Sequence, residues 1–306
     1  MAESDIPDVV IIGAGMAGLS TAIWARRLGL SALVLEREMQ AGGQLTMIRG
    51  RIVDYPGLDL PEGGALAERL VRQAAELGAD LQLDNPVKTI DAANRRCVTA
   101  RGNVAGRALV IATGITPRQL EVPGEADLYR AHLVRRPSHD YAWFQGRRVA
   151  VIGGGDRAAE NALMLRGAAA QIHLIHRGES LRARASLTDP IHADSRIALH
   201  YGTRVQHVTV NGNEAVITAE QGDQLVRFTV DAVCIYIGNR PNTTLVDGQL
   251  DLTDEGYILT DRTGQSSLPG VYAVGDVCTL PPFQALVTAA GQAMVVAKQI
   301  ALRHAP

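Results

Sequence analysis

Short, continuous runs of apolar residues recur along the chain, and turn-forming residues follow several of them. The runs occupy residues 9–12, 32–35, 108–111, 149–152, 172–175 and 232–237. Runs of this kind, rich in valine, isoleucine and leucine, are typical of parallel strands that are buried on both faces. Alanine-rich stretches of helix-forming composition follow the first and the fourth run. The pattern therefore predicts an α/β protein built on parallel sheets.

The order of these runs indicates that one domain is inserted into another. The run at 108–111 leads into Ala112-Thr113-Gly114 and a proline-bearing linker, and the run at 232–237 leads in a similar way into Gly238 and a polar segment. After a further short strand, an alanine-rich helix at 288–304 closes the chain and returns to the first domain. We expect a first domain of residues 1–116 and 244–306, and a second domain of residues 117–243.

A glycine pattern that suits phosphate groups follows the first apolar run. The sequence reads Gly13-Ala14-Gly15-Met16-Ala17-Gly18, here called the first glycine cradle. Gly13 permits a tight turn, Gly15 lets the backbone approach a pyrophosphate, and Gly18 lets the helix pack close to the strand. The anion would rest on N–H groups at the helix N-terminus. Glu36, which follows the second run, is placed to accept hydrogen bonds from the ribose of an adenosine. The alternative is a plain strand–turn–helix whose glycines serve packing alone.

The same pattern recurs after the run at 149–152. Gly153-Gly154-Gly155-Asp156-Arg157-Ala158 forms the second glycine cradle, in which Ala158 takes the place of the third glycine. The next run ends in His176-Arg177 instead of an acid, and Arg182 follows. Cations at this point favour a 2′-phosphate, and thus NADPH over NADH, unless they are only solvated surface charges. Two cradles indicate two dinucleotides in one protein, and we expect two Rossmann-like, three-layer domains with the second inserted in the first.

Composition and charge exclude several other classes of protein. A chain of 306 residues is long enough for two domains, and 46% of its residues are hydrophobic. The net charge of −2 gives no reason to expect binding to nucleic acid or to an anionic membrane. No apolar stretch reaches the length of a membrane span, and the short acidic start does not resemble a signal peptide. We therefore expect a cytoplasmic protein.

Cysteine usage also narrows the chemistry. The chain has three cysteines, Cys97, Cys234 and Cys278, which lie far apart in the sequence. They form no C-x-x-C motif and no spacing that suits a structural zinc ion, so we expect no metal. Cys234 lies in an apolar run and is expected in the core. Cys278, two residues after Asp276, is expected to pack in its loop or to lie near a cofactor.

Taken together, the motifs resemble the low-molecular-weight thioredoxin reductase group of FAD- and NADPH-dependent flavoproteins, over nearly the whole chain. Beyond the two cradles, the resemblance rests on Gly42-Gly43-Gln44-Leu45-Thr46, Tyr55-Pro56-Gly57, Ala112-Thr113-Gly114, Gly275-Asp276-Val277 and Gln284-Ala285 with Thr288-Ala289-Ala290-Gly291. It implies FAD in the first domain, NADPH in the inserted domain, a homodimer, and rotation of one domain against the other during turnover.

The resemblance also implies roles for individual residues. Asp276 would hydrogen-bond the flavin ribitol, Glu36 would hold the adenosine ribose, and Gln284 with Ala285 would lie near the flavin pyrimidine. Gln44 and Thr46 would line the flavin or would form an ordinary polar loop. The expected FAD contacts are Gly13, Gly15, Met16, Ala17, Gly18, Glu36, Arg37, Gly43, Gln44, Leu45, Val87, Ala112, Thr113, Gly114, Gly275, Asp276, Gln284, Ala285 and Thr288. The expected NADPH contacts are Gly153, Gly155, Asp156, Ala158, His176, Arg177 and Arg182.

The chain departs from the thioredoxin reductase pattern where that pattern carries its redox cysteines. Ahead of the second cradle stand Arg136-Pro137-Ser138-His139, followed by Asp140, so dithiol exchange through this segment is excluded. His139 and Asp140 are the candidate catalytic residues, with His139 as a proton donor, unless it is simply an exposed loop residue. Gly178 and Phe283 stand where the family has arginines.

Three functions are compatible with these observations. The first is an NADPH-oxidising flavoprotein that passes electrons to a carrier such as ferredoxin or flavodoxin, because ferredoxin/flavodoxin–NADP reductases of the thioredoxin reductase type also lack the cysteine pair. The second is an oxidase or reductase that acts on a small molecule at the flavin. The third is a non-catalytic sensor that binds FAD or NADPH.

Overall fold

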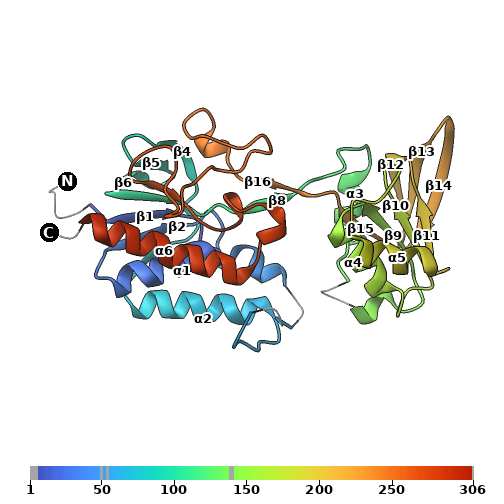
Figure 1. Cartoon of the computed structure of the whole chain (residues 1–306), viewed down its shortest axis with the longest axis horizontal. Helices are drawn as coiled ribbons and strands as arrows, with labels where there is room; N and C mark the ends of the chain where they lie inside the picture. Colours follow the sequence, from blue (N-terminus) through green and yellow to red (C-terminus); the bar gives the residue numbers. More distant parts are fainter. Residues whose placement is uncertain (1–5, 49–50, 53–54, 138–140, 305–306) are drawn as a thin grey trace. The chain divides into compact units, whose positions relative to one another are not determined.

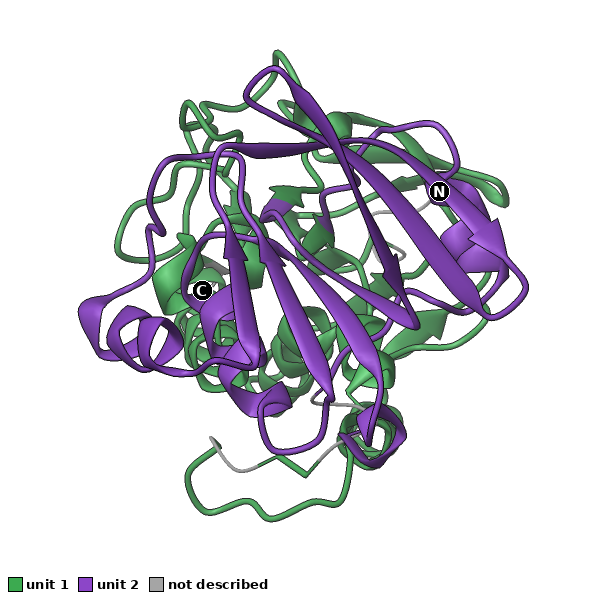
Figure 2. Ribbon diagram, turned by 90° about the vertical axis from the view of Figure 1, so that its right-hand side faces the viewer, with its two compact units in different colours: residues 1–116, 240–306 green, residues 117–239 purple. Residues whose placement is uncertain are grey.

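The computed structural model describes residues 6–48, 51–52, 55–137 and 141–304, and these form two compact units. Unit 1 consists of residues 1–116 and 240–306, and unit 2 of residues 117–239 (Figure 1). Figure 2 draws the two units in green and purple. The expected second boundary, after residue 243, therefore lies a few residues too late. The reason is Asn242, whose backbone N–H donates to Gly114 O at 3.0 Å and whose side-chain amide donates to Thr113 O at 2.8 Å, both in unit 1.

Unit 1 is built on a five-stranded parallel sheet, as the apolar runs predict. Its strands follow the order β17 (Val271–Ala273), β7 (Ala108–Ile111), β1 (Val9–Ile12), β2 (Ala32–Leu35) and β3 (Asp80–Gln82). Three helices cover one face, namely α1 (Met16–Arg27), α2 (Gly63–Glu76) and α6 (Leu286–His304). An antiparallel sheet of β4 (Val87–Asp91), β5 (Arg96–Thr99) and β6 (Gly102–Ala105) lies on the other.

The burial of β1, the central strand, on both faces explains why its sequence does not alternate between apolar and polar residues. Val9 and Ile11 pack into the hydrophobic cluster on the helical side of the sheet, whereas Val10 and Ile12 pack into the cluster on the opposite side. All four side chains are buried. Both faces of the strand are therefore covered, and a polar residue at any of these positions would lose its contact with water.

Unit 2 repeats this three-layer plan with a smaller sheet. Its parallel strands follow the order β11 (Ile197–His200), β10 (Gln171–Ile175), β9 (Arg148–Gly153) and β15 (Ala232–Tyr236). Two helices, α4 (Asp156–Leu165) and α5 (Ala185–Ala193), pack on one face. The antiparallel strands β12 (Thr203–Asn211), β13 (Glu214–Gln221) and β14 (Gln224–Val230), together with helix α3 (Glu125–Arg130), pack on the other. The expected fold class, two Rossmann-like α/β units, is confirmed.

Two neighbouring strands carry the chain between the units. β8 (Ile115–Pro117) leads into unit 2 and β16 (Asn239–Pro241) leads out of it, and the two strands pair with each other. Asn242 secures the unit 1 end of this pair, because its side-chain oxygen accepts a hydrogen bond from Thr116 Oγ1 at 2.8 Å. The remaining short helical turns are η2 (Gly43–Met47), η3 (Tyr141–Phe144), η4 (Thr244–Val246), η5 (Gly275–Val277) and η6 (Pro281–Phe283).

Candidate nucleotide-binding sites

The first glycine cradle joins β1 to α1 and has room for a ligand at one glycine only. A Cβ atom on Gly13 would lie 2.5 Å from Ala112 O, and one on Gly18 would lie 1.9 Å from Gly13 O. Gly13 also has φ +105°, which side chains rarely adopt. In contrast, the nearest atom to a Cβ on Gly15 is Gly43 Cα, at 4.0 Å. Gly13 and Gly18 therefore serve the turn and the packing, and Gly15 leaves open the face that a pyrophosphate would approach.

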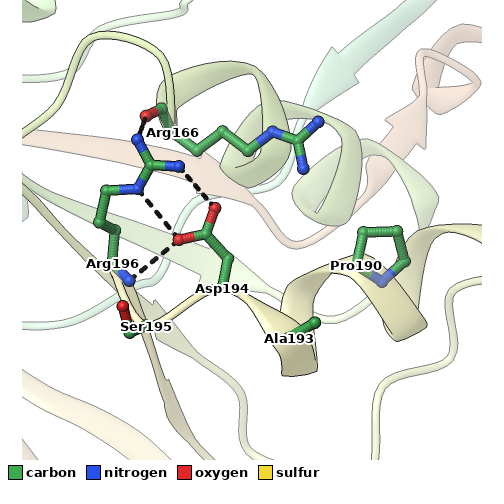
Figure 3. Close-up of a pocket in the computed structure, with 6 residues that line it drawn as sticks. All are labelled: Arg166, Pro190, Ala193, Asp194, Ser195 and Arg196. Atoms are coloured by element: carbon green, nitrogen blue, oxygen red, sulfur yellow. Dashed lines mark hydrogen bonds and ion pairs between the residues drawn. The ribbon is translucent and has the colours of Figure 1, made fainter.

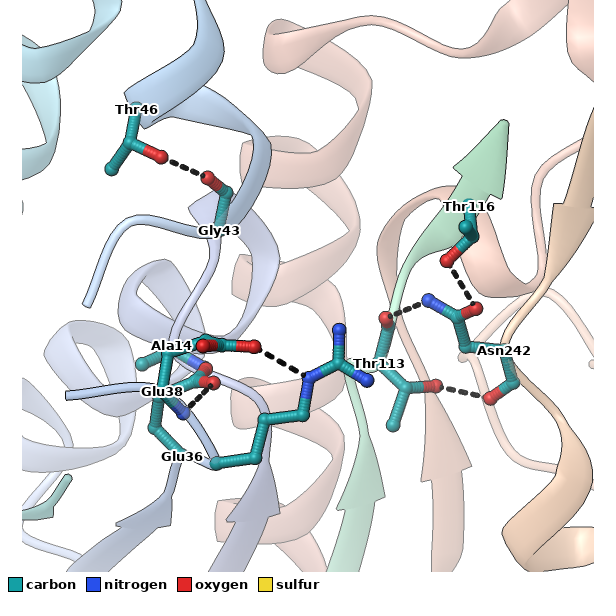
Figure 4. Close-up of polar contacts among 9 residues, drawn as sticks. Ala14, Glu36, Glu38, Gly43, Thr46, Thr113, Thr116 and Asn242 are labelled. Carbon is teal, nitrogen blue, oxygen red and sulfur yellow. Dashed lines mark hydrogen bonds and ion pairs between the residues drawn. The ribbon is translucent and has the colours of Figure 1, made fainter. Parts of the chain in front are cut away.

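Glu36 is buried and fixes the end of β2 against this cradle (Figure 4). Its Oε2 accepts a hydrogen bond from the Ala14 N–H at 2.7 Å, and its Oε1 accepts one from the Glu38 N–H at 3.0 Å. A carboxylate offers about four lone-pair sites. Two bonds from backbone donors therefore leave Glu36 with the capacity to accept from ribose hydroxyls. The side chain of Arg37, in contrast, is exposed and pairs with neighbouring Glu38 at 3.1 Å.

The segment after β17 carries the residues expected beside a flavin. Asp276 is half-buried in η5, directly after Gly275, whose N–H donates to Gln292 Oε1 at 2.7 Å. Gln284 lies just before α6 and donates from Nε2 to Thr279 O at 3.0 Å. Its buried Oε1 has no hydrogen-bond partner among the described residues. Leaving a buried acceptor unpaired costs about 1–3 kcal/mol. The Gln284 oxygen therefore suits a bound hydrogen-bond donor, as a flavin would provide.

The parallel sheet brings several of the expected FAD contacts to one edge of unit 1, because the carboxyl ends of parallel strands meet there. The segments at this edge are 13–15, 36, 112–114 and 275–276. Met16, Ala17 and Leu45 belong to the helix-side core, so their side chains pack within the protein. The other expected residues lie in η2 (Gly43 and Gln44), at the start of β4 (Val87), before α6 (Ala285) and in its first turn (Thr288).

The second cradle divides its roles in the same way. A Cβ on Gly153 would lie 2.3 Å from Tyr236 O, and Gly153 has φ +151°. A Cβ on Gly154 would lie 2.3 Å from the ring of His176, whereas nothing lies within 4 Å of one on Gly155. Ala158 is fully buried, where the first cradle has its third glycine. The open position is Gly155, just before α4, which corresponds to Gly15 in the first cradle.

His176 packs against the second cradle. Its ring is buried above Gly154, and a Cβ on Gly178 would lie 2.7 Å from its Nε2. Burial lowers the pKa of His176 below its usual 6.5, and the neighbouring charges of Arg182 and Arg177 lower it further. His176 is therefore neutral at neutral pH. It shapes the loop and adds no positive charge for a phosphate.

Arg177 and Arg182 are exposed in the loop that follows β10, and the Arg182 N–H donates to Gly154 O at 2.7 Å. The sequence interpretation missed two further arginines beside the same cradle. Arg184 bonds to Asp156, and Arg157 stands in the first turn of α4. The sequence did contain two signals for them. One is the third arginine in the 177–184 loop, and the other is the basic residue inside the glycine motif itself.

Comparisons with known proteins agree with this arrangement. The family model described as pyridine nucleotide-disulphide oxidoreductase matches residues 7–298. The chain belongs to this family. It is 32% identical over 295 residues to thioredoxin reductase of Listeria monocytogenes, which covers 94% of this chain and 91% of that protein. It is 31% identical over 282 residues to the 34.2 kDa protein in the rubredoxin operon of Clostridium pasteurianum, with 90% and 91% covered. The crystal structure of Lactococcus lactis thioredoxin reductase superposes with a TM-score of 0.80 at 26% identity, over 97% of this chain and 99% of that chain.

This family and these relatives establish the general activity. The protein is an FAD-dependent pyridine nucleotide oxidoreductase of the thioredoxin reductase-like group, which binds FAD and NADPH. In the part of the chain that the structure describes, no group of three or more histidine, cysteine or acidic residues could hold a metal ion. In the same part of the chain, no helix is long and apolar enough to cross a membrane.

The segment where the thioredoxin reductase pattern places its cysteines is only partly described. His139 and Asp140, the candidate catalytic residues, lie outside the described residues, whereas Arg136 is half-buried. Nearby, two guanidinium groups lie over the ring of Trp143, with Arg135 3.8 Å and Arg147 4.1 Å from its centroid. Cation–π contacts of this kind contribute about 0.5–2 kcal/mol. They link Trp143 to Arg135 and to Arg147.

All three cysteines are free thiols, and none is activated. Burial raises the pKa of Cys97 and of Cys278 to about 12, and raises the pKa of the fully buried Cys234 as well. Since the thiolate is the reactive form, these groups are poor nucleophiles at neutral pH. Cys234 and Cys97 are core residues. Cys278 donates from Sγ to Gly275 O at 3.3 Å and is held within its loop.

A surface hollow of about 500 Å³ lies elsewhere in unit 2 (Figure 3). Its lining includes Asp194, Ser195 and Arg196, which precede β11, so it lies toward the amino ends of the parallel strands. The glycine cradle is at the opposite, carboxyl ends. Arg196 is occupied in this hollow by Asp194, at 2.8 Å, and by the backbone oxygen of Arg166. We therefore place no nucleotide there.

Proposed function

We propose that this protein oxidises NADPH through FAD and passes the electrons to an acceptor other than a dithiol of its own chain, such as a ferredoxin- or flavodoxin-type carrier. The observation that carries the proposal is the pair Arg136 and His139 at the positions of the redox cysteines. Neither side chain can exchange with a disulfide. The three thiols that the chain does have are separated and unactivated, which supports the same conclusion.

In this proposal, unit 1 holds FAD through the open face of Gly15, the carboxylates of Glu36 and Asp276, and the segment around Gln284. FAD, when bound, accepts a hydride from nicotinamide and can release electrons singly or in pairs. The N-terminus of α6 adds a partial positive charge near Gln284, which favours negative charge on a ligand there. His139 and Asp140 are our candidates for proton transfer.

Unit 2 holds NADPH through the second cradle, with a modest preference over NADH. Arg177 and Arg182 are the candidate contacts to the 2′-phosphate, and each charge-assisted contact contributes about 1.5–3 kcal/mol at most. Both side chains are exposed, so solvent reduces this contribution. Gly178, in place of a third arginine, reduces it further.

We further propose a homodimer that works in the cytoplasm. Val287, Val295 and Leu302 are exposed on α6, and their spacing places them on one face of the helix. A second copy of the chain would cover such a face. Three free thiols are typical of a reducing compartment. Sedimentation analysis tests the dimer, and a monomer at micromolar concentration would contradict it.

The central experiment is anaerobic mixing of the FAD-loaded protein with NADPH and, separately, with NADH, followed by flavin absorbance. We expect NADPH to bleach the flavin faster than NADH at equal concentration. Ferredoxin, flavodoxin, thioredoxin and a small quinone are then added as acceptors. Reduction of a carrier protein supports the proposal, and reduction of the quinone alone favours a small-molecule reductase. A flavin that NADPH does not bleach would favour a sensor.

A matched variant tests the argument from the missing cysteines. Arg136→Cys combined with His139→Cys should produce a long-wavelength charge-transfer band between thiolate and flavin if these positions face the ring. Arg130→Cys, an exposed position in the same unit, serves as the control and should give no band. Turnover with thioredoxin by the unmodified protein would overturn the proposal.

A further inference from the structure

The loop that carries Arg177 and Arg182 joins β10 to α5 and has no helix or strand of its own. Backbone donors secure it at three points. Arg182 N–H donates to Gly154 O at 2.7 Å, Gly202 N–H donates to Gly178 O at 3.0 Å, and Arg184 N–H donates to Asp156 Oδ1 at 2.9 Å. The last of these bonds is to a side chain on α4, so the position of the loop depends on where that carboxylate is held.

The side chain of Arg184 pairs with this carboxylate and with a second one. Its guanidinium lies 2.7 Å from Glu160 Oε1 and 3.8 Å from Asp156 Oδ2. Asp156 and Glu160 are one helical turn apart at the start of α4, so both carboxylates face the same partner. Arg184 therefore balances negative charge directly beside an anion cradle. Because it is occupied by two acids, it is not available to a phosphate.

The ion pairs themselves add little to folding. The side chains of Arg184, Asp156 and Glu160 are 59%, 47% and 45% exposed, and pairs this open to solvent have little influence on stability. A variant that lacks Arg184 should therefore fold. What changes is the position of the loop and the local charge.

The middle of the loop has little room for a side chain at Gly178. A Cβ on Gly178 would lie 2.7 Å from Nε2 of the buried His176 ring. Within the 177–184 loop, Arg177 and Arg182 are left to face a 2′-phosphate, and neither forms an ion pair with a described residue. Discrimination between NADPH and NADH thus rests on two exposed side chains, whose placement the loop must supply.

We propose that Arg184 is a positioning residue for nucleotide choice: through Asp156 and Glu160 it fixes the 177–184 loop so that Arg177 and Arg182 meet the 2′-phosphate, without touching the nucleotide itself. This inference rests on the proposed use of the second cradle for NADPH.

The test is calorimetric titration of the FAD-loaded protein with NADP⁺ and with NAD⁺, which measures binding without turnover. In Arg184→Ala, the ratio of NADP⁺ to NAD⁺ affinity should fall about tenfold, the equivalent of one charge-assisted contact, while NAD⁺ affinity changes less than about twofold. Arg184→Lys, which keeps the charge, should retain part of the ratio. Arg196→Ala removes another exposed arginine of unit 2, near the amino end of β11, and should match the unmodified protein.

Glu160→Gln separates positioning from direct contact. If Arg184 acts through its acidic partners, this variant should also lower the affinity ratio. If Arg184 grips the phosphate itself, loss of Glu160 would release it and raise the ratio, which would overturn the inference. An unchanged ratio in Arg184→Ala would also overturn it. If the unmodified protein binds neither dinucleotide, both this inference and the proposed function are refuted. If it binds NADP⁺ and NAD⁺ but the ratio is unchanged in Arg184→Ala, this inference alone fails.

Discussion

Two alanine substitutions within the first glycine cradle should have different effects. Gly18→Ala places a Cβ atom 1.9 Å from Gly13 O and 3.4 Å from Ala112 Cβ. Both neighbours belong to the buried junction of β1, β7 and α1, so neither can rotate away. Gly15→Ala is the matched control. Its Cβ has no neighbour closer than 4.0 Å, and Gly15 has φ −80°, which alanine adopts readily.

The size of each effect follows from these distances. To reach even a 3.0 Å contact, the start of α1 must move from β1 by about 1 Å, and overpacking of this kind costs about 1–3 kcal/mol. For a domain of this size, each kcal/mol lowers Tm by about 2–4 °C. Gly15→Ala should leave the stability of the FAD-free protein within about 1 kcal/mol. Its methyl group occupies the open face instead, so FAD affinity should fall about 10- to 100-fold, or about 1.4–2.8 kcal/mol.

Thermal unfolding of the FAD-free proteins, followed by FAD titration of each, measures the two effects separately. Removing FAD matters because a ligand that binds only the folded state raises Tm and would mask the difference. A Gly18→Ala protein with the same Tm as the unmodified protein would refute the steric argument. A Gly15→Ala protein that binds FAD with unchanged affinity would refute the assignment of the open face to the pyrophosphate.

Three further perturbations test other parts of the molecule. Burial lowers the pKa of both His173 and His200, whose Nδ1 and Nε2 atoms are 3.0 Å apart, so the folded state binds fewer protons than the unfolded state. Their contribution to stability is complete above the unfolded pKa of about 6.5 and is lost as pH falls below it toward the folded value. His200→Gln should therefore flatten the dependence of Tm on pH below about 6.5, and an unchanged profile would contradict this. Asn242→Ala removes the side chain that secures the connecting strands and should speed amide hydrogen exchange there, whereas unchanged exchange would argue against this role. Asp231→Ala removes the carboxylate that accepts from both the backbone N–H and the guanidinium of Arg148 at 2.7 Å, and leaves Glu214 as the guanidinium's acidic partner; it should cost about 1–3 kcal/mol in urea unfolding, and a smaller loss would contradict this role.

The sequence predicts the structure best at positions where a single physical requirement determines which residue type fits. The run at 149–152 must be apolar throughout because both faces of β9 are covered, and Gly153 must turn at φ +151°, so both features are visible without a structure. The strands β12–β14 gave no such signal. Their buried residues alternate with half-buried or exposed ones, as in β13, where one face packs within unit 2 and the other is partly open to solvent.

The sequence alone could not predict which side chains contact one another around the second cradle. His176 follows a strand and resembles a phosphate contact in the sequence, yet its ring is buried over Gly154. The link from Arg184 to Asp156 joins two segments 28 positions apart. Which of several exposed arginines meets which acid depends on tertiary packing, and no local pattern records it.

The pairing of β8 with β16 has a consequence for how this protein could have arisen. Paired strands lie about 5 Å apart. The points where the chain enters and leaves unit 2, near Pro117 and Asn239, are therefore neighbours. A segment whose two ends are neighbours can be inserted into another domain at a single surface site. The insertion separates the two flanking residues of that domain by little more than a hairpin turn does, so its entropic cost is small. By the same logic, residues 117–239 form a cassette that could be expressed alone or exchanged for the corresponding cassette of a relative, while a short turn seals the remaining scaffold.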